Sequence, residues 1–166
     1  MKLQILDRAK KKKFIERIGY TGVTKINELL IKTGKERIRA FSGNLSREEI
    51  MDFWKIMPIE GIGLYVAKDF VSKKGIYETR LSLDGLHLLK NQIKNNILVL
   101  TKEQEEDWFK GKNIELNEGQ DAGDKNFVSV KSSDGKDFIG TAKLDGEGKI
   151  LYGFLPKERR RKSQVI

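Results

Sequence analysis

The 166-residue chain contains no cysteine and only one histidine, His87. Disulfide bonds and thiolate chemistry are therefore excluded, and the cysteine and histidine sets that usually bind zinc cannot form. No apolar run approaches the roughly 20 residues that a membrane-spanning helix needs. The charged N-terminal segment lacks the apolar core of a signal peptide. We therefore expect a soluble, cytoplasmic protein that does not associate with membranes.

Sequence motifs of nucleotide-dependent and hydrolytic enzymes are also missing. No Walker loop occurs, and Gly61-Ile62-Gly63 fails the dinucleotide-binding pattern because Val66 stands where its third glycine should be. Ser42 and Ser82 lack the glycine context of a nucleophile elbow. His87 lies inside an apolar helical segment, which favours a buried structural role over catalysis. We accordingly predict that the protein is not an enzyme and binds no cofactor or metal.

Positive charge is in clear excess. Lysine and arginine total 33 against 24 aspartates and glutamates, which gives a formal net charge of +9. Such an excess favours a polyanionic partner, either a nucleic acid or an anionic membrane surface. With no membrane-associated segment in the sequence, nucleic acid is the better of the two interpretations.

The N-terminal half mixes helices and strands. Apolar spacing predicts a helix over 3–18, and a hairpin follows whose second strand, 37–41, places two arginines on one face. Ser46-Arg47-Glu48-Glu49 forms a capping box that opens a helix, and Pro58 ends this helix. Apolar residues at helical spacing predict that the helix packs into the core through Ile50, Phe53, Trp54 and Met57.

The C-terminal half is richer in short strands. Strands are predicted at 97–100, 127–131, 138–142 and 149–154. A second capping box, Thr101-Lys102-Glu103-Gln104, opens a helix through Trp108 and Phe109, which Gly111 ends in the left-handed conformation. We place the domain boundary between residues 70 and 95, with domains at 1–75 and 76–166. The second domain fits a small closed barrel.

Three basic groups are candidates for phosphate binding. Arg37 and Arg39 would form a ridge on a strand, and Lys110-Gly111-Lys112 combines two lysines with a glycine that admits a close backbone. The third group is the tail 157–162. The alternative for each is an ordinary solvated face or a disordered tail. The run Lys10-Lys11-Lys12-Lys13 is less specific than any of the three.

Two aromatic residues, Tyr152 and Phe154, precede the basic tail on one strand face. Next to cations, such a face can stack RNA bases. The other interpretation is that this face belongs to the core.

The order of these motifs resembles that of PUA domains. The segments that carry the resemblance are 63–65, 80–82, 86–89, 97–100, Glu103-Gln104 with Trp108, 110–112, 138–142 and 155–160. They are most similar to the C-terminal PUA-like domains of Sun-type RNA cytosine-5 methyltransferases. Segment 32–43 is similar to the pre-PUA segment of small stand-alone archaeal PUA proteins.

The resemblance implies a β pseudo-barrel with flanking helices that binds structured RNA. RNA would lie along the helix 83–89, the loop 110–112 and the final strand with its basic end. The chain lacks the methyltransferases' catalytic domain, with its cofactor loop and nucleophilic cysteine. It would therefore support RNA modification only as a partner.

Together these observations predict an α+β protein in which a mixed α/β pre-PUA domain precedes a PUA-like pseudo-barrel. We expect a monomeric, non-catalytic protein that binds tRNA or rRNA in RNA modification or ribosome biogenesis. The predicted RNA-binding residues are Arg37, Arg39, Lys110, Gly111, Lys112, Lys157, Arg159 and Arg160.

Two alternatives remain. An adaptor that docks on an RNA-modifying enzyme or a ribosomal subunit would expose an apolar patch in its N-terminal half. A magnesium-dependent nuclease would bring three carboxylates into one cleft.

Overall fold

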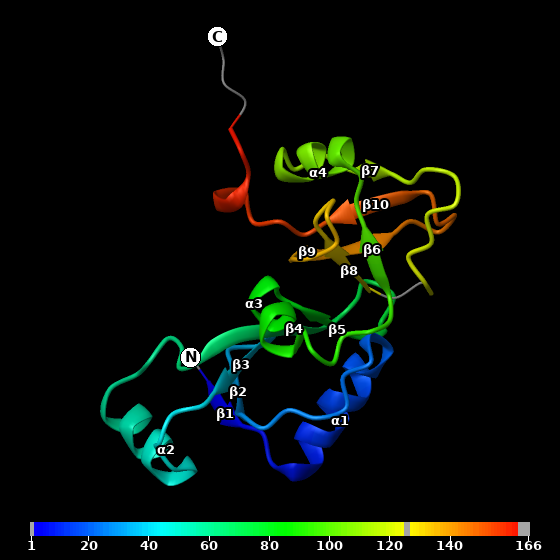
Figure 1. Cartoon of the computed structure of the whole chain (residues 1–166). Helices are drawn as coiled ribbons and strands as arrows, with labels where there is room; N and C mark the ends of the chain where they lie inside the picture. Colours follow the sequence, from blue (N-terminus) through cyan, green and yellow to red (C-terminus); the bar gives the residue numbers. More distant parts are fainter. Residues whose placement is uncertain (1, 125–126, 163–166) are drawn as a thin grey trace. The chain divides into compact units, whose positions relative to one another are not determined.

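A computed structural model describes residues 2–124 and 127–162 of the chain. These residues form four α-helices, two short 3-10 helices and two five-stranded sheets, one of them curled into a half-barrel (Figure 1). The predicted α+β class is confirmed. The chain divides into two compact units, which we call the N-terminal unit (1–19 and 23–89) and the C-terminal unit (20–22 and 90–166).

The N-terminal unit is built on an antiparallel sheet whose strands lie in chain order. Its strands are β1 (Leu3–Ile5), β2 (Leu29–Thr33), β3 (Arg37–Phe41), β4 (Leu64–Val71) and β5 (Tyr77–Leu81). Its helices are α1 (Arg8–Ile18), α2 (Arg47–Ile56) and α3 (Leu83–Leu89). The predicted hairpin is the pair β2 and β3, joined by residues 34–36.

The first helix begins later than predicted. Leu3–Ile5 is strand β1, which pairs with β2, and α1 starts at Arg8. Asp7, two residues after the strand, caps the helix, because its carboxylate accepts a hydrogen bond from the Lys10 amide at 2.8 Å. The prediction of one helix from residue 3 was therefore wrong for its first five residues.

Helix α2 has the predicted capping box but not the predicted core stripe. The Ser46 hydroxyl accepts from the Glu49 amide at 3.1 Å, and the Glu49 carboxylate accepts from the Ser46 amide at 2.7 Å. Ile50 is fully buried and Trp54 half-buried, whereas Phe53 and Met57 are exposed. The helix thus buries only one narrow side against the sheet, which leaves apolar side chains on its surface.

The two units divide between Leu89 and Lys90, within the expected interval but after the expected boundary at 75/76. Strand β5 belongs to the first sheet because it pairs with β4 along its whole length. Helix α3 follows directly, and the Ser82 amide donates to the Val66 carbonyl at 2.9 Å. Gly85 of α3 lies so close to Val66 that a Cβ at this position would overlap the Val66 carbonyl oxygen. β5 and α3 therefore complete the N-terminal unit.

The C-terminal unit contains the second sheet, in the order β6-β8-β9-β10-β7. Its elements are β6 (Ile97–Val99), α4 (Lys102–Phe109), β7 (Ile114–Glu115), β8 (Phe127–Lys131), β9 (Phe138–Leu144), β10 (Ile150–Gly153) and the 3-10 helix η2 (Lys157–Arg159). The other 3-10 helix, η1 (Gly19–Thr21), follows α1. β6 is parallel to β8, and the other pairs are antiparallel.

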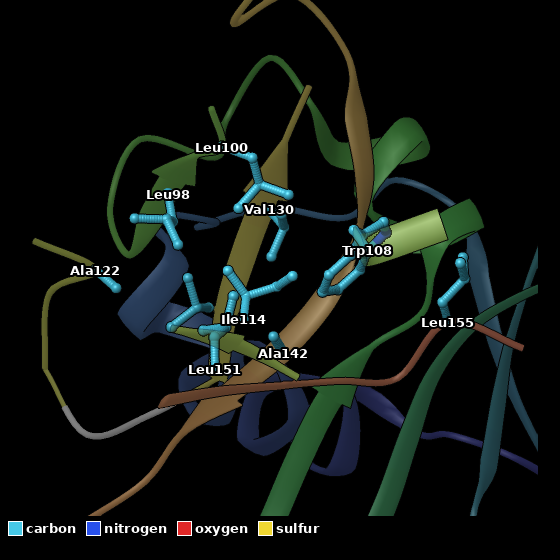
Figure 2. Packing of buried hydrophobic residues seen from close by; sticks show 10 residues of the cluster. Leu98, Leu100, Trp108, Ile114, Ala122, Val130, Ala142, Leu151 and Leu155 are labelled. Atoms are coloured by element: carbon cyan, nitrogen blue, oxygen red, sulfur yellow. The ribbon is translucent and has the colours of Figure 1, made fainter. Parts of the chain in front are cut away.

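Trp108 of α4 anchors the core of this unit (Figure 2). Its side chain is fully buried and donates through Nε1 to the Ile139 carbonyl at 3.2 Å. Around it pack Leu98, Leu100, Ile114, Ala122, Val128, Val130, Ala142, Leu151 and Leu155. The capping box that opens α4 is confirmed, with Thr101 and Gln104 exchanging hydrogen bonds at 3.0 and 3.2 Å.

Candidate nucleic-acid interface

In the C-terminal unit, the segment after β10 returns to the end of α4. The Arg161 amide donates to the Phe109 carbonyl at 2.7 Å. The Arg161 guanidinium lies over the Phe109 ring, 4.9 Å from its centroid. A backbone hydrogen bond and a cation–π contact therefore hold the basic C-terminal segment against the helix end.

The loop after α4 receives a second arginine of the same segment. Gly111 has a φ of +77°, and its amide donates to the Trp108 carbonyl at 2.9 Å, so it ends the helix as predicted. A Cβ on Gly111 would lie 2.6 Å from Arg160 Cδ, so the missing side chain leaves room for the arginine. Arg160 Nε is held by the Leu155 carbonyl at 3.1 Å.

These contacts bring the predicted loop and tail residues together. We call the group the basic rim, and it consists of Lys110, Lys112, Lys157, Arg159, Arg160 and Arg161. Lys110, Lys112, Lys157 and Arg159 are exposed. Arg161 was not among the predicted site residues, and its place in a run of arginines gave no reason to single it out.

Acidic side chains reduce the charge of the rim: Glu158 lies between Lys157 and Arg159, and Asp107 pairs with Lys112. Lys112 Nζ lies 2.9 Å from Asp107 Oδ1. This hydrogen bond from Lys112 lowers the pKa of Asp107 below the usual aspartate range. Both side chains are well exposed, so the pair contributes little to stability. Lys112 can therefore leave Asp107 and bind an anion of higher charge.

Two aromatic side chains, Tyr152 in β10 and Phe154 directly after it, point away from the core. Tyr152 and Phe154 are 43% and 39% exposed, while Leu151, on the opposite face of the strand, is fully buried. The interpretation that these aromatics are core residues is therefore wrong. Phe154 also meets Phe127 edge to face at 5.9 Å, and Lys143 Nζ lies 4.9 Å from the centre of the Phe127 ring. Exposed rings and a cation thus share this surface.

The two predicted arginines of the N-terminal unit differ from each other. Arg37 is exposed, with its guanidinium 5.9 Å from the centre of the Tyr65 ring. Arg39 is half-buried, donates through Nη1 to the Gly63 carbonyl at 3.1 Å and packs on Gly61. Its Nε is buried without a hydrogen-bond partner in the described part of the chain. Arg39 therefore holds the loop before β4, and of the two only Arg37 is well exposed.

The sequence interpretation missed a second group of cations. Lys10, Lys13 and Arg17 of α1 line a cavity together with Lys32 of β2. The spacing of the three helical residues was the available indication, because it places them on one side of a helix. The run of four lysines concealed it, since every direction around the helix then carries charge.

The expected burial of His87 was wrong. His87 is exposed, whereas its neighbour Leu86 is fully buried. Within residues 2–124 and 127–162, no three carboxylate or histidine side chains are grouped so that they could hold a metal ion. Over the same residues, no helix is long and apolar enough to cross a membrane.

Fold and surface together define a two-unit α+β protein with cation-rich surfaces beside exposed aromatic rings. Comparison with known proteins adds no family: no family model and no curated protein matches the chain.

Proposed function

We propose that the protein is a non-catalytic RNA-binding protein whose C-terminal unit is a PUA-like domain. The observation that carries the proposal is the basic rim, which gathers cations from the loop after α4 and from the C-terminal segment. The exposed rings of Tyr152 and Phe154 support it, because aromatic faces next to cations suit RNA bases and phosphates. Structured tRNA or rRNA, engaged during RNA modification or ribosome biogenesis, is the proposed partner.

The proposed binding mode is electrostatic positioning combined with recognition of shape. The lysines of the rim neutralise backbone phosphates and release counterions, so affinity falls steeply as salt rises. Arg160 and Arg161 are already fixed by their contacts with Leu155 and Phe109, so they lose less conformational freedom on binding than free side chains would. The aromatic face adds stacking where an RNA end or loop exposes its bases.

Fluorescence anisotropy with tRNA and rRNA fragments over a range of salt concentrations tests the proposal. Lys110→Gln and Lys157→Gln each remove one exposed cation of the rim, and each should lower the slope of log affinity against log salt by about 1. Lys149→Gln is the matched control, because Lys149 is an exposed lysine of the same unit that pairs with Glu147 in the turn before β10. Absent or salt-independent binding would contradict the proposal, as would equal losses in all three variants.

The exposed face of α2 favours a second candidate, an adaptor that docks on an RNA-modifying enzyme or a ribosomal subunit. Ile56 is 85% exposed, Phe53 is exposed on the same final turn of the helix, and Met57 is exposed at the C-cap that follows. Isolated apolar residues on a surface are common, but a group of them on one helix turn is typical of protein contacts. An adaptor would explain why Phe53 and Met57, two of the four residues predicted for the core stripe, point outward.

Co-sedimentation with purified ribosomal subunits after ribonuclease treatment of free RNA separates the two candidates. The adaptor predicts that Ile56→Glu abolishes co-sedimentation, whereas Lys55→Gln, next to it and equally surface-located, does not. If co-sedimentation depends on Lys110 and not on Ile56, RNA binding accounts for the association.

A further inference from the structure

The N-terminal unit contains a cavity of about 230 Å³ between α1 and its sheet. Four cationic side chains line it: Lys10, Lys13 and Arg17 from α1, and Lys32 from β2. The only acidic residue in the lining is Asp69 of β4. The walls therefore carry four positive charges and one negative charge.

The four consecutive lysines 10–13 of α1 make different contacts. Lys11 Nζ donates to the Glu28 carbonyl at 2.7 Å, and burial lowers the pKa of this lysine. Lys12 lies outside the cavity and pairs with Glu16 at 4.0 Å. Residues 10, 13 and 17 are spaced by three and four, so they share one helical face. Two of the four lysines are thus directed to the cavity, and the other two have different partners.

The Asp69 carboxylate already has several polar partners, and its single negative charge cannot neutralise all four cations of the cavity. Its carboxylate is 3% exposed and accepts hydrogen bonds from the Thr79 and Tyr77 hydroxyls at 2.6 and 2.9 Å. Arg17 Nη2 donates to it at 3.1 Å, and Lys32 Nζ lies 3.6 Å away. Arg17 is fixed further by Thr79 at 3.0 Å and by the Tyr77 ring at 4.8 Å. Asp69 therefore positions Arg17 and Lys32, and it does not pair with Lys10 or Lys13.

The two outer lysines, Lys10 and Lys13, are exposed and can reach a ligand. Among the described residues, Lys13 has no ion-pair partner. Lys10 lies 3.6 Å from Asp7, but both side chains are more than half exposed, so this pair is weak. The excess charge faces a partly enclosed space, where the attraction to an anion exceeds that on an open surface.

We propose that this cavity binds a phosphate group, carried by RNA or by a small phosphorylated compound. A phosphate spreads its charge over oxygens that point in several directions, and the cavity offers donors from a helix on one side and a sheet on the other. Asp69 keeps Arg17 and Lys32 in place before the ligand arrives. Only the assignment of RNA as the carrier rests on the function proposed above, because the cavity and the basic rim involve different residues.

Titration of the full chain with inorganic phosphate at constant ionic strength, followed by amide NMR, tests the cavity directly. Saturable shifts should appear at Lys10, Lys13 and Arg17. Lys13→Gln should weaken the phosphate affinity about tenfold, the loss expected for one charged hydrogen bond. Lys12→Gln, the matched control one residue away on the same helix, should leave the affinity unchanged.

The outcomes separate the cavity from the basic rim. Absence of shifts at these residues, or equal weakening by Lys12→Gln and Lys13→Gln, overturns the proposal. Displacement of the bound phosphate by RNA identifies RNA as the carrier, and saturable phosphate binding that RNA does not displace identifies a small phosphorylated compound. If phosphate binds here while Lys110→Gln has no effect on any RNA, the cavity stands and the function proposed for the rim fails.

Discussion

The indole of Trp108 lies between two glycines on neighbouring strands, Gly140 of β9 and Gly153 of β10. A Cβ at Gly140 would be 2.6 Å from Cζ2 of the ring, and a Cβ at Gly153 would be 2.6 Å from Cζ3. The ring is buried and cannot move aside easily. The residues that follow it in α4 and the next loop hold Arg160 and Arg161, so the position of this one side chain affects the rim as well as the core.

Gly153→Ala should destabilise the C-terminal unit by about 1–3 kcal/mol, the usual cost of overpacking a core. The cause is steric, because Gly153 has no positive φ that an alanine would resist. Hydrogen exchange of the β8 and β9 amides measures the change. Gly146→Ala is the control, since Gly146 has open space around it and its φ is also not positive. Similar amide exchange rates in the two variants would show that the Trp108 ring can shift to make room for the added methyl group.

At the scale of elements, the two capping boxes are chemically different. The box of α2 uses the carboxylate of Glu49, and the box of α4 uses the neutral amide of Gln104. The Gln104 side chain also donates to the Glu115 carbonyl at 2.9 Å, which ties the start of α4 to β7. Only the first box can respond to pH in the acidic range.

We expect α2 to fray in acid while α4 keeps its cap. The hydrogen bond from the Ser46 backbone amide, together with the Ser46 side chain, lowers the pKa of Glu49. Because that pKa is lower in the folded than in the unfolded chain, the stabilisation is complete above the ordinary glutamate range and is lost as pH falls through the lowered value. Protection factors of the first-turn amides of both helices, followed from neutral to acidic pH, check this. Glu49→Gln should remove the pH dependence, and parallel behaviour of both helices would contradict the explanation.

The capping boxes were predictable because their hydrogen bonds join residues three apart in the sequence. The hairpin of β2 and β3 and the end of α4 at Gly111 were predictable for the same reason: turn and cap chemistry is local. The start of α1 was not, because Leu3–Ile5 becomes a strand only through pairing with β2, far along the chain. Apolar periodicity alone fits a helix and a strand equally well over so short a segment.

The candidate site shows the same limit. The loop and tail cations were found by their composition, but their contact through Gly111 and Arg160 depends on how the chain returns after β10. The outward direction of Phe53 and Met57 depends on how narrow a side α2 buries against the sheet. Lys10 and Lys13 belong to a candidate site only because Lys32 and Asp69 line the same cavity. These two residues lie on strands that the sequence pattern could not place beside α1.

At the scale of the whole molecule, each compact unit has its own group of cations on a chain of net charge +9. One RNA that reaches both groups would bind through two linked contacts, and the second contact would form at high effective concentration. An oligonucleotide of about five nucleotides, near the smallest footprint of a single-strand binding surface, would occupy only one group at a time.

A long RNA that reaches both groups and a short oligonucleotide that occupies only one should respond differently to Lys13→Gln in the N-terminal unit. If RNA is the carrier and one molecule reaches both groups, this substitution and Lys110→Gln should each reduce affinity for an intact tRNA. Their fold-changes should then multiply in the double variant, because both contacts contribute to one bound state. On the short oligonucleotide, Lys13→Gln should have a smaller effect, because the molecules bound at the basic rim do not use the cavity. Anisotropy titrations of both RNAs at one salt concentration measure the fold-changes. An equal effect of Lys13→Gln on the two RNAs would show that the two groups of cations do not engage the same RNA molecule.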